Sequence, residues 1–151
     1  MMQKDNITYI KMRECDVKGV SEIESECFSE PWSENVFRLE LDNENAVTIA
    51  ALDGEKVVGF INFHCILDEV NINNVAVTED FRKKHIGENL VILSEEYVKD
   101  KASVINLEVR ESNISAIALY KKLGFDKVGM RKNFYSKPTE NAILMTKRLK
   151  Q

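Results

Sequence analysis

The sequence predicts an α/β protein of the α+β kind, in which one mixed, mainly antiparallel sheet of seven strands carries about four helices on its two faces. The first observation behind this fold class is the order of apolar patterns along the chain: strand, two helices, three strands, helix, strand, helix, two strands. The second is size, because 151 residues with 44% hydrophobic content can form one domain with a sizeable core. We therefore expect a single domain over residues 1–151.

The N-terminal part of the chain should form one strand and two helices. Residues 8–12 alternate weakly between apolar and polar, as a strand does. Asp16 can cap the first helix, whose apolar residues lie close to one helical face: Val17, Val20, Ile23 and Cys27. Pro31 ends this helix, and Ser33 can cap a shorter helix through Leu41. Both helices should lie over the first strand and form one wall of a cleft.

Three strands follow in succession. Residues 46–52 and 56–67 are strand-like, and the pair Asp53-Gly54 between them favours a tight hairpin turn. Residues 70–78 predict the next strand, which leads into a basic loop.

The C-terminal half alternates helices with strands. A long helix ending near Lys101 is predicted by apolar positions at helical spacing: Leu90, Leu93 and Tyr97. This helix can be the crossover that parallel strands need, so the strand over 104–109 should lie parallel to the one before the basic loop. A further helix ends at Gly124, a residue favoured after helix C-termini, and residues 125–134 and 142–149 predict the last two strands.

Composition limits the possible functions. A net charge of −4 argues against a general nucleic-acid binder. The three cysteines are widely spaced without a CxxC pair and indicate neither a disulfide framework nor a metal site. Since we find neither a signal peptide nor a stretch of membrane-spanning length, we expect a cytoplasmic protein without a membrane partner. The oligomeric state cannot be predicted from these features.

The basic loop is a candidate anion site. Arg82, Lys83 and Lys84 are consecutive cations directly before the long helix. Backbone N–H groups at a helix N-terminus have no intrahelical partner, and the helix dipole is positive there. A phosphate or pyrophosphate is therefore the natural ligand. Taken alone, the pattern also fits an ordinary crossover with solvated charges.

A second candidate site spans the end of the strand over 104–109 and the helix after it. Glu108 stands at the strand end, where side chains point into a crevice at the carboxyl edge of a sheet. Asn113 falls in the first turn of the helix, and Tyr120 lies about two turns later near the same face. A carboxylate and a phenol in one cleft form a candidate acid–base pair. The alternative is a solvated strand end and a core aromatic.

Together these stretches resemble the GCN5-related N-acetyltransferase (GNAT) family. The loop is similar to the family's acyl-CoA loop, Gln/Arg-x-x-Gly-x-Gly/Ala, in which Arg82 and Gly87 match and His85 replaces the first glycine. Because His85 places a side chain where the backbone should approach a pyrophosphate most closely, it should affect cofactor affinity. The second stretch is similar to that of RimI-type ribosomal-protein-alanine N-acetyltransferases, where Leu-Glu-Val-Arg-x-Ser-Asn and Ala-x-x-Leu-Tyr-x-x-Leu-Gly-Phe recur.

The resemblance implies roles for the matched residues. Glu108 would be the general base, Tyr120 would protonate the departing thiolate, and Asn113 would contact CoA. Acetyl-CoA would also be bound by strand and loop residues: Val75, Ala76, Val77, Arg82, Lys83, Lys84, His85, Ile86, Gly87 and Glu88. The strand would pair its backbone with the pantetheine amides, and in the family it diverges from its parallel neighbour to admit that arm. The resemblance implies no metal.

Two further segments resemble those that RimI-type enzymes use beside the peptide. Trp32 lies in a Pro-Trp segment of the first helical region, and Tyr135 ends a segment similar to Arg-x-Asn-Tyr-Tyr before the last hairpin. Both would contact the substrate, and either could equally be a packing residue.

The resemblance therefore implies acetyl transfer from acetyl-CoA to the N-terminal α-amine of a protein, most specifically an alanine-initiated small-subunit ribosomal protein. An α-ammonium has a pKa of roughly 8, so a carboxylate acting through water can remove its proton and no covalent enzyme intermediate is needed. Two alternatives remain: a GNAT enzyme acting on a small-molecule amine, and a non-catalytic acyl-CoA-binding module.

Overall fold

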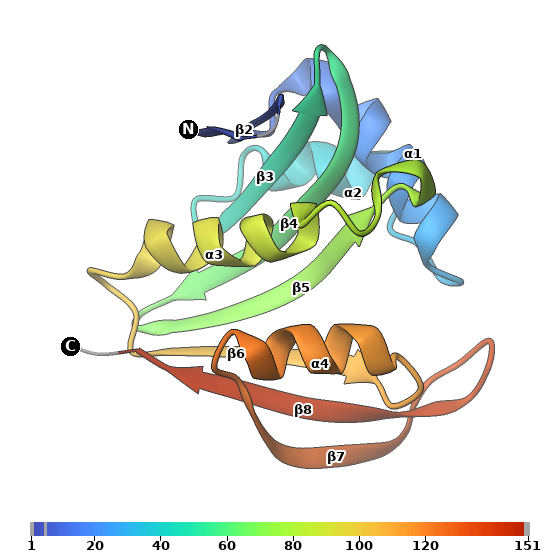
Figure 1. Ribbon diagram of the computed structural model, residues 1–151, viewed down its shortest axis with the longest axis vertical. Helices are drawn as coiled ribbons and strands as arrows, with labels where there is room; N and C mark the ends of the chain where they lie inside the picture. The colour runs from blue at the N-terminus through green and yellow to red at the C-terminus, as the bar shows by residue number, and fades with distance from the viewer. Residues whose placement is uncertain (1, 5, 150–151) are drawn as a thin grey trace.

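The computed structural model describes residues 2–4 and 6–149 and confirms the predicted fold (Figure 1). The strands are β1 (Met2–Lys4), β2 (Ile7–Lys11), β3 (Ala46–Asp53), β4 (Lys56–Ile66), β5 (Glu69–Val77), β6 (Val104–Arg110), β7 (Asp126–Tyr135) and β8 (Glu140–Arg148). The α-helices are α1 (Val17–Cys27), α2 (Glu34–Glu40), α3 (Ile86–Val98) and α4 (Ile114–Lys122). Strands β2 to β8 are the seven predicted ones, and β1 adds a short edge strand that the sequence analysis did not predict.

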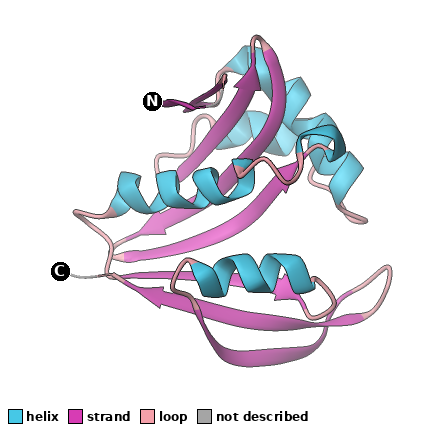
Figure 2. Ribbon diagram, viewed as in Figure 1, coloured by secondary structure: helices cyan, strands magenta, loops and turns pink. Residues whose placement is uncertain are grey.

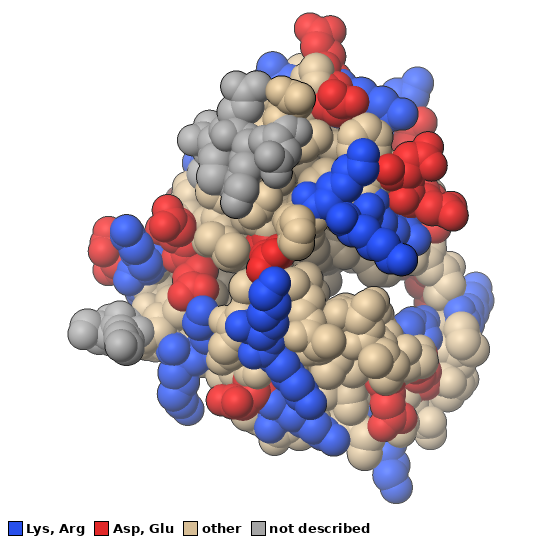
Figure 3. All heavy atoms as spheres, viewed as in Figure 1, with Lys and Arg blue, Asp and Glu red and all other residues tan. Residues whose placement is uncertain are grey.

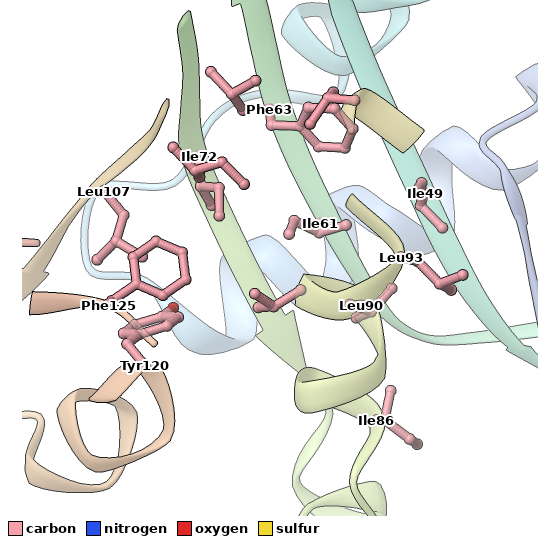
Figure 4. Packing of buried hydrophobic residues seen from close by; sticks show 14 of the residues in the cluster. Ile49, Ile61, Phe63, Ile72, Ile86, Leu90, Leu93, Leu107, Tyr120 and Phe125 are labelled. Atoms are coloured by element: carbon pink, nitrogen blue, oxygen red, sulfur yellow. The ribbon is translucent and has the colours of Figure 1, made fainter. Parts of the chain in front are cut away.

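The strands form one sheet in the order β1-β2-β3-β4-β5-β6-β8-β7. All neighbours are antiparallel except β5 and β6, which are parallel and joined through α3 as predicted. Helices cover both faces (Figure 2). Phe60 of β4 packs with α1 and α2, whereas Ile61, the next residue, packs with α3 and α4 (Figure 4). The alternation along β4 thus supplies two separate cores.

The central feature of the sheet is the divergence of its parallel pair. β5 and β6 pair only over residues 69–72 and 104–107, although both strands continue further. Asn73 is an extra residue in the pairing of β5 with β4, because Asn62 pairs with Asn74 and Phe63 with Ile72. Such a bulge bends the strand that carries it. Beyond the bulge, β5 and β6 separate as the family resemblance implies (Figure 1).

Helix ends follow local chemistry with one correction. Ser33 caps α2 by accepting a hydrogen bond from the Val36 N–H, and Gly124 has the left-handed φ of +99° expected after α4. Asp16 does not cap α1 with its side chain as predicted. Its carboxylate instead accepts hydrogen bonds from the side chain and the backbone N–H of Arg13. No helix among the described residues is long and apolar enough to span a membrane.

Candidate active site

An opening lies where β5 and β6 separate. The space-filling view shows it between β5 and α4 (Figure 3). On β6, Leu107 and Val109 point into the core shared with α3 and α4, so Glu108 between them points to the opposite face, where it is exposed. Tyr120 approaches from α4 on the first face. The predicted base and acid therefore reach the opening from the two faces of the sheet.

Tyr135 connects these two groups electrostatically. Burial first, and then the nearby charge of Glu108, raise the pKa of Tyr135 to about 12. Burial, and then Tyr135, likewise raise the pKa of Tyr120 to about 12. Both phenols therefore keep their protons at neutral pH. Glu108, Tyr120 and Tyr135 thus lie within electrostatic reach of one another around the opening.

Tyr120 is both a core aromatic and a candidate acid. Its ring is 8% exposed and packs edge-on against Phe125, with 5.7 Å between the ring centroids (Figure 4). Its hydroxyl bonds to no described residue, yet no buried side-chain nitrogen or oxygen in the described part of the chain lacks a partner. The hydroxyl oxygen must therefore be accessible to solvent, and its proton is available to a ligand.

The basic loop enters α3 through His85, which has a left-handed backbone conformation. His85 has φ +63° and ψ 15°, a left-handed conformation that glycine adopts most readily. Its C=O accepts the Asn89 N–H in the first turn of α3, and its Nδ1 lies 3.0 Å from Glu88 Oε2. Glu88 also pairs with Lys122 of α4 at 2.9 Å, so an ion pair joins the start of α3 to the end of α4.

The other loop cations differ in their roles. Arg82 Nε donates to the Val77 C=O at 3.0 Å, which ties the loop to the end of β5. Lys84 lies over the Phe81 ring, with its ammonium 5.2 Å from the centroid, and Lys83 is exposed. Beside the loop, β5 has no β6 partner over residues 75–77, so its backbone edge can receive an added strand.

Asn113 occupies the corner between β6 and α4. Its Oδ1 accepts the Ala116 N–H at 3.2 Å and thereby caps α4. Its Nδ2 donates to no described residue and remains available to a ligand.

Arg110, a residue that the sequence analysis did not single out, joins several segments next to Tyr135. Its guanidinium lies 4.5 Å from the Tyr135 ring centroid and donates to the C=O groups of Ser136 and Pro138, each at 3.0 Å. It also reaches Ser29 Oγ at 3.4 Å, so it joins the β7–β8 loop to the segment after α1. The only sequence signal was a cation two residues after Glu108.

A buried carboxylate, also missed, anchors that segment. Glu24 is 1% exposed and accepts hydrogen bonds from Asn74 Nδ2 at 2.8 Å and from the Trp32 N–H at 2.9 Å. Burial raises the pKa of Glu24. The Trp32 ring packs against the Phe37 ring, with 5.3 Å between the centroids. Tyr135, the other predicted substrate residue, lies close enough to Glu108 for the charge of Glu108 to act on it. The binding roles of both stay predictions.

Comparison with known proteins decides the family. The model of the acetyltransferase (GNAT) family matches residues 17–125. The chain belongs to the GNAT family. GNAT enzymes use acetyl-CoA, and this member is an acetyl-CoA-dependent N-acetyltransferase.

Relatives of this GNAT chain share most of its length. It is 33% identical over 143 residues to the ribosomal protein bS18-alanine N-acetyltransferase of Escherichia coli, covering 91% of this chain and 95% of that one. The Haemophilus influenzae enzyme of the same name is 33% identical over 135 residues, which cover 87% of this chain and 91% of that enzyme. The crystal structure of the Escherichia coli enzyme superimposes on this chain with a TM-score of 0.88 and 28% identity. The superposition covers 96% of this chain and 95% of that enzyme.

Proposed function

We propose that this protein acetylates the N-terminal α-amine of a protein, most specifically that of an alanine-initiated small-subunit ribosomal protein. The relatives named above, which carry that activity in their names, support the substrate class. The observation that carries the proposal is the approach of a carboxylate, Glu108, and a protonated phenol, Tyr120, to one opening from opposite faces of the sheet.

The two faces suggest how the substrates are separated. Acetyl-CoA would lie on the side of α3 and α4, with its pyrophosphate at the N-terminus of α3 and its pantetheine amides on the edge of residues 75–77 that β6 does not pair with. The free Nδ2 of Asn113 is suited to a pantetheine carbonyl. The peptide would enter on the opposite side, beneath the contacts that Arg110 makes with the β7–β8 loop.

The reaction then needs one proton acceptor and one proton donor. Glu108, directly or through water, takes a proton from the substrate ammonium, whose pKa is roughly 8. The amine nitrogen attacks the thioester carbonyl, a C–N bond forms and the C–S bond breaks. Tyr120 protonates the departing thiolate, and solvent returns the proton to its oxygen. Tyr120 starts in the state that a proton donor requires, since its raised pKa keeps the hydroxyl protonated.

Mass spectrometry of reactions with acetyl-CoA tests the proposal. An alanine-initiated ribosomal peptide should gain one acetyl group on its α-amine, a version with a blocked N-terminus should gain none, and Glu108→Gln should reduce turnover by about 100-fold or more. Acetylation confined to small amines would refute the protein substrate. CoA binding without transfer to any peptide or amine would instead identify a binding module. Unchanged turnover by Glu108→Gln would remove Glu108 from its assigned role.

A further inference from the structure

A chain of polar side chains crosses the sheet on the side of α1 and α2, outside the residues assigned so far. Glu40 of α2 accepts from Asn62 Nδ2 at 3.0 Å and lies 2.6 Å from His64 Nε2. Asn62 also donates to Thr48 Oγ1 at 2.9 Å, and its Oδ1 accepts from Asn73 Nδ2 at 2.9 Å. Asn62 is fully buried. A buried amide with all its partners in place holds a defined orientation.

Glu40 determines which groups donate and which accept along this row of side chains. An ionised carboxylate can only accept hydrogen bonds, so Asn62 must turn its NH₂ group toward Glu40 and its carbonyl oxygen toward Asn73. Asn73 must then donate with its own NH₂ group. The Oδ1 of Asn73 is thereby turned away from Asn62 and the other hydrogen-bonded side chains. No described residue donates to that oxygen, and Asn73 is exposed.

Asn73 stands opposite the candidate base in the register of β5 and β6. Ile72 and Leu107 are the last residues at which β5 and β6 pair with each other, and Asn73 and Glu108 are the next residues on the two strands. Asn73 bonds to side chains on the face of α2, the same face to which Glu108 points. The two residues therefore flank the point where β5 and β6 begin to separate. Figure 1 shows that separation of the two strands.

We propose that Asn73 is a substrate-orienting residue whose Oδ1 accepts an N–H of the incoming amine, and that Glu40, acting through Asn62, is its positioning residue. The inference rests on the proposed function and extends it. After losing one proton to Glu108, the amine has two N–H groups and a lone pair. Rotation about its C–N bond decides where the lone pair points. An acceptor fixed beside the base holds that rotation so that the lone pair faces the thioester.

Kinetics with paired substrates test this role. The substrates are an alanine-initiated peptide and the same peptide beginning with N-methylalanine, which has one N–H fewer after deprotonation. Asn73→Ala should lower kcat/KM for the alanine peptide about tenfold, the size expected for one hydrogen bond. It should also reduce the preference for alanine over N-methylalanine by a similar factor. Acetyl-CoA affinity, measured by calorimetry, should not change.

Asn71→Ala is the matched control, because Asn71 lies on the same strand and is also exposed, but it stands in the part of β5 that pairs with β6. It should leave both rates unchanged. Glu40→Gln should cause a smaller loss of the preference for alanine over N-methylalanine. A glutamine amide can donate as well as accept, so it no longer fixes which way the Asn62 amide is oriented. A merely structural role for Glu40 would lower the unfolding temperature without changing the preference.

An unchanged preference in a folded Asn73→Ala protein would overturn the proposal, as would equal losses in Asn73→Ala and Asn71→Ala. Failure of the proposed function is distinguishable, because it is seen in the unmodified enzyme as absent peptide acetylation. If small amines proved to be the substrates, the same comparison with a primary amine and its N-methyl derivative would decide the role of Asn73. An enzyme that acetylates no amine would overturn both proposals.

Discussion

Replacing Tyr120 with phenylalanine removes one oxygen atom from the site and keeps the ring in the core. The ring contact with Phe125 at 5.7 Å remains, and the hydroxyl bonds to no described residue. Its loss therefore leaves no buried partner unsatisfied, and we expect the free energy of unfolding to change by less than about 1 kcal/mol. For a chain of this size, that corresponds to at most about 4 °C in Tm.

The effect on catalysis should be much larger. Because burial, and then Tyr135, raise the pKa of Tyr120 to about 12, the hydroxyl is a protonated donor throughout the neutral range. A general acid in this position contributes about 10² to 10⁴-fold, so kcat should fall at least about 100-fold while acetyl-CoA affinity is retained. In the unmodified enzyme, kcat/KM should show no loss from ionisation of Tyr120 below about pH 10.

The assay follows release of the CoA thiol with the alanine-initiated peptide, alongside thermal unfolding and calorimetry with acetyl-CoA. Tyr97→Phe is the control, since it removes a hydroxyl from α3 and retains a ring that packs edge-on against Phe63. It should leave kcat unchanged. If folded Tyr120→Phe kept kcat within about threefold of the unmodified enzyme, Tyr120 would be a core aromatic only, and the acid would have to be sought elsewhere.

Three further variants probe the supports of the site. His85→Gly should bind acetyl-CoA several-fold more tightly in calorimetry, because glycine takes the left-handed loop conformation without a side chain facing the ligand; an unchanged affinity would show that His85 does not oppose the cofactor. Glu24→Gln should lower the free energy of unfolding by about 1–3 kcal/mol in denaturant unfolding, although it removes a buried charge. Both carboxylate oxygens of Glu24 accept hydrogen bonds, so the NH₂ group of a glutamine would face another donor. Stability equal to that of the unmodified protein would mean that the surrounding donors can reorient. Arg110→Lys should raise KM for the peptide about tenfold with little change in acetyl-CoA affinity, since a single ammonium cannot hold several loop acceptors at once; an unaltered KM would show that the bridged loops do not shape peptide binding.

The pH dependence of stability follows from the same phenol. Its folded-state pKa of about 12 lies above the ordinary value of 10.0, so the protonated hydroxyl favours the folded state. This contribution is complete below pH 10 and is lost as the pH rises toward 12. Denaturant unfolding between those limits should therefore show a steeper loss of stability in the unmodified protein than in Tyr120→Phe. Parallel curves would contradict the assigned pKa.

Local sequence determined the elements of this protein. Helical spacing, strand alternation and the turn at Asp53-Gly54 depend on neighbouring residues only, and the elements that they predicted are present. Ser33 caps its helix as predicted because its acceptor lies three residues away. Asp16 does not, because Arg13, equally near, competes for the same carboxylate. The motifs around Glu108 and Tyr120 likewise indicated the family without any structure.

Only the tertiary structure decided how the site is built. The sequence could not show that Glu108 and Tyr120 reach one opening from opposite faces, because that depends on where β5 and β6 stop pairing. Nor could it show the orientation of Asn73, which is set through Asn62 by Glu40, a residue on another element. Polar side chains take their direction from partners that are distant in the chain, and periodicity carries no information about those partners. The elements follow from local sequence, whereas the direction in which each polar group points follows from the packing.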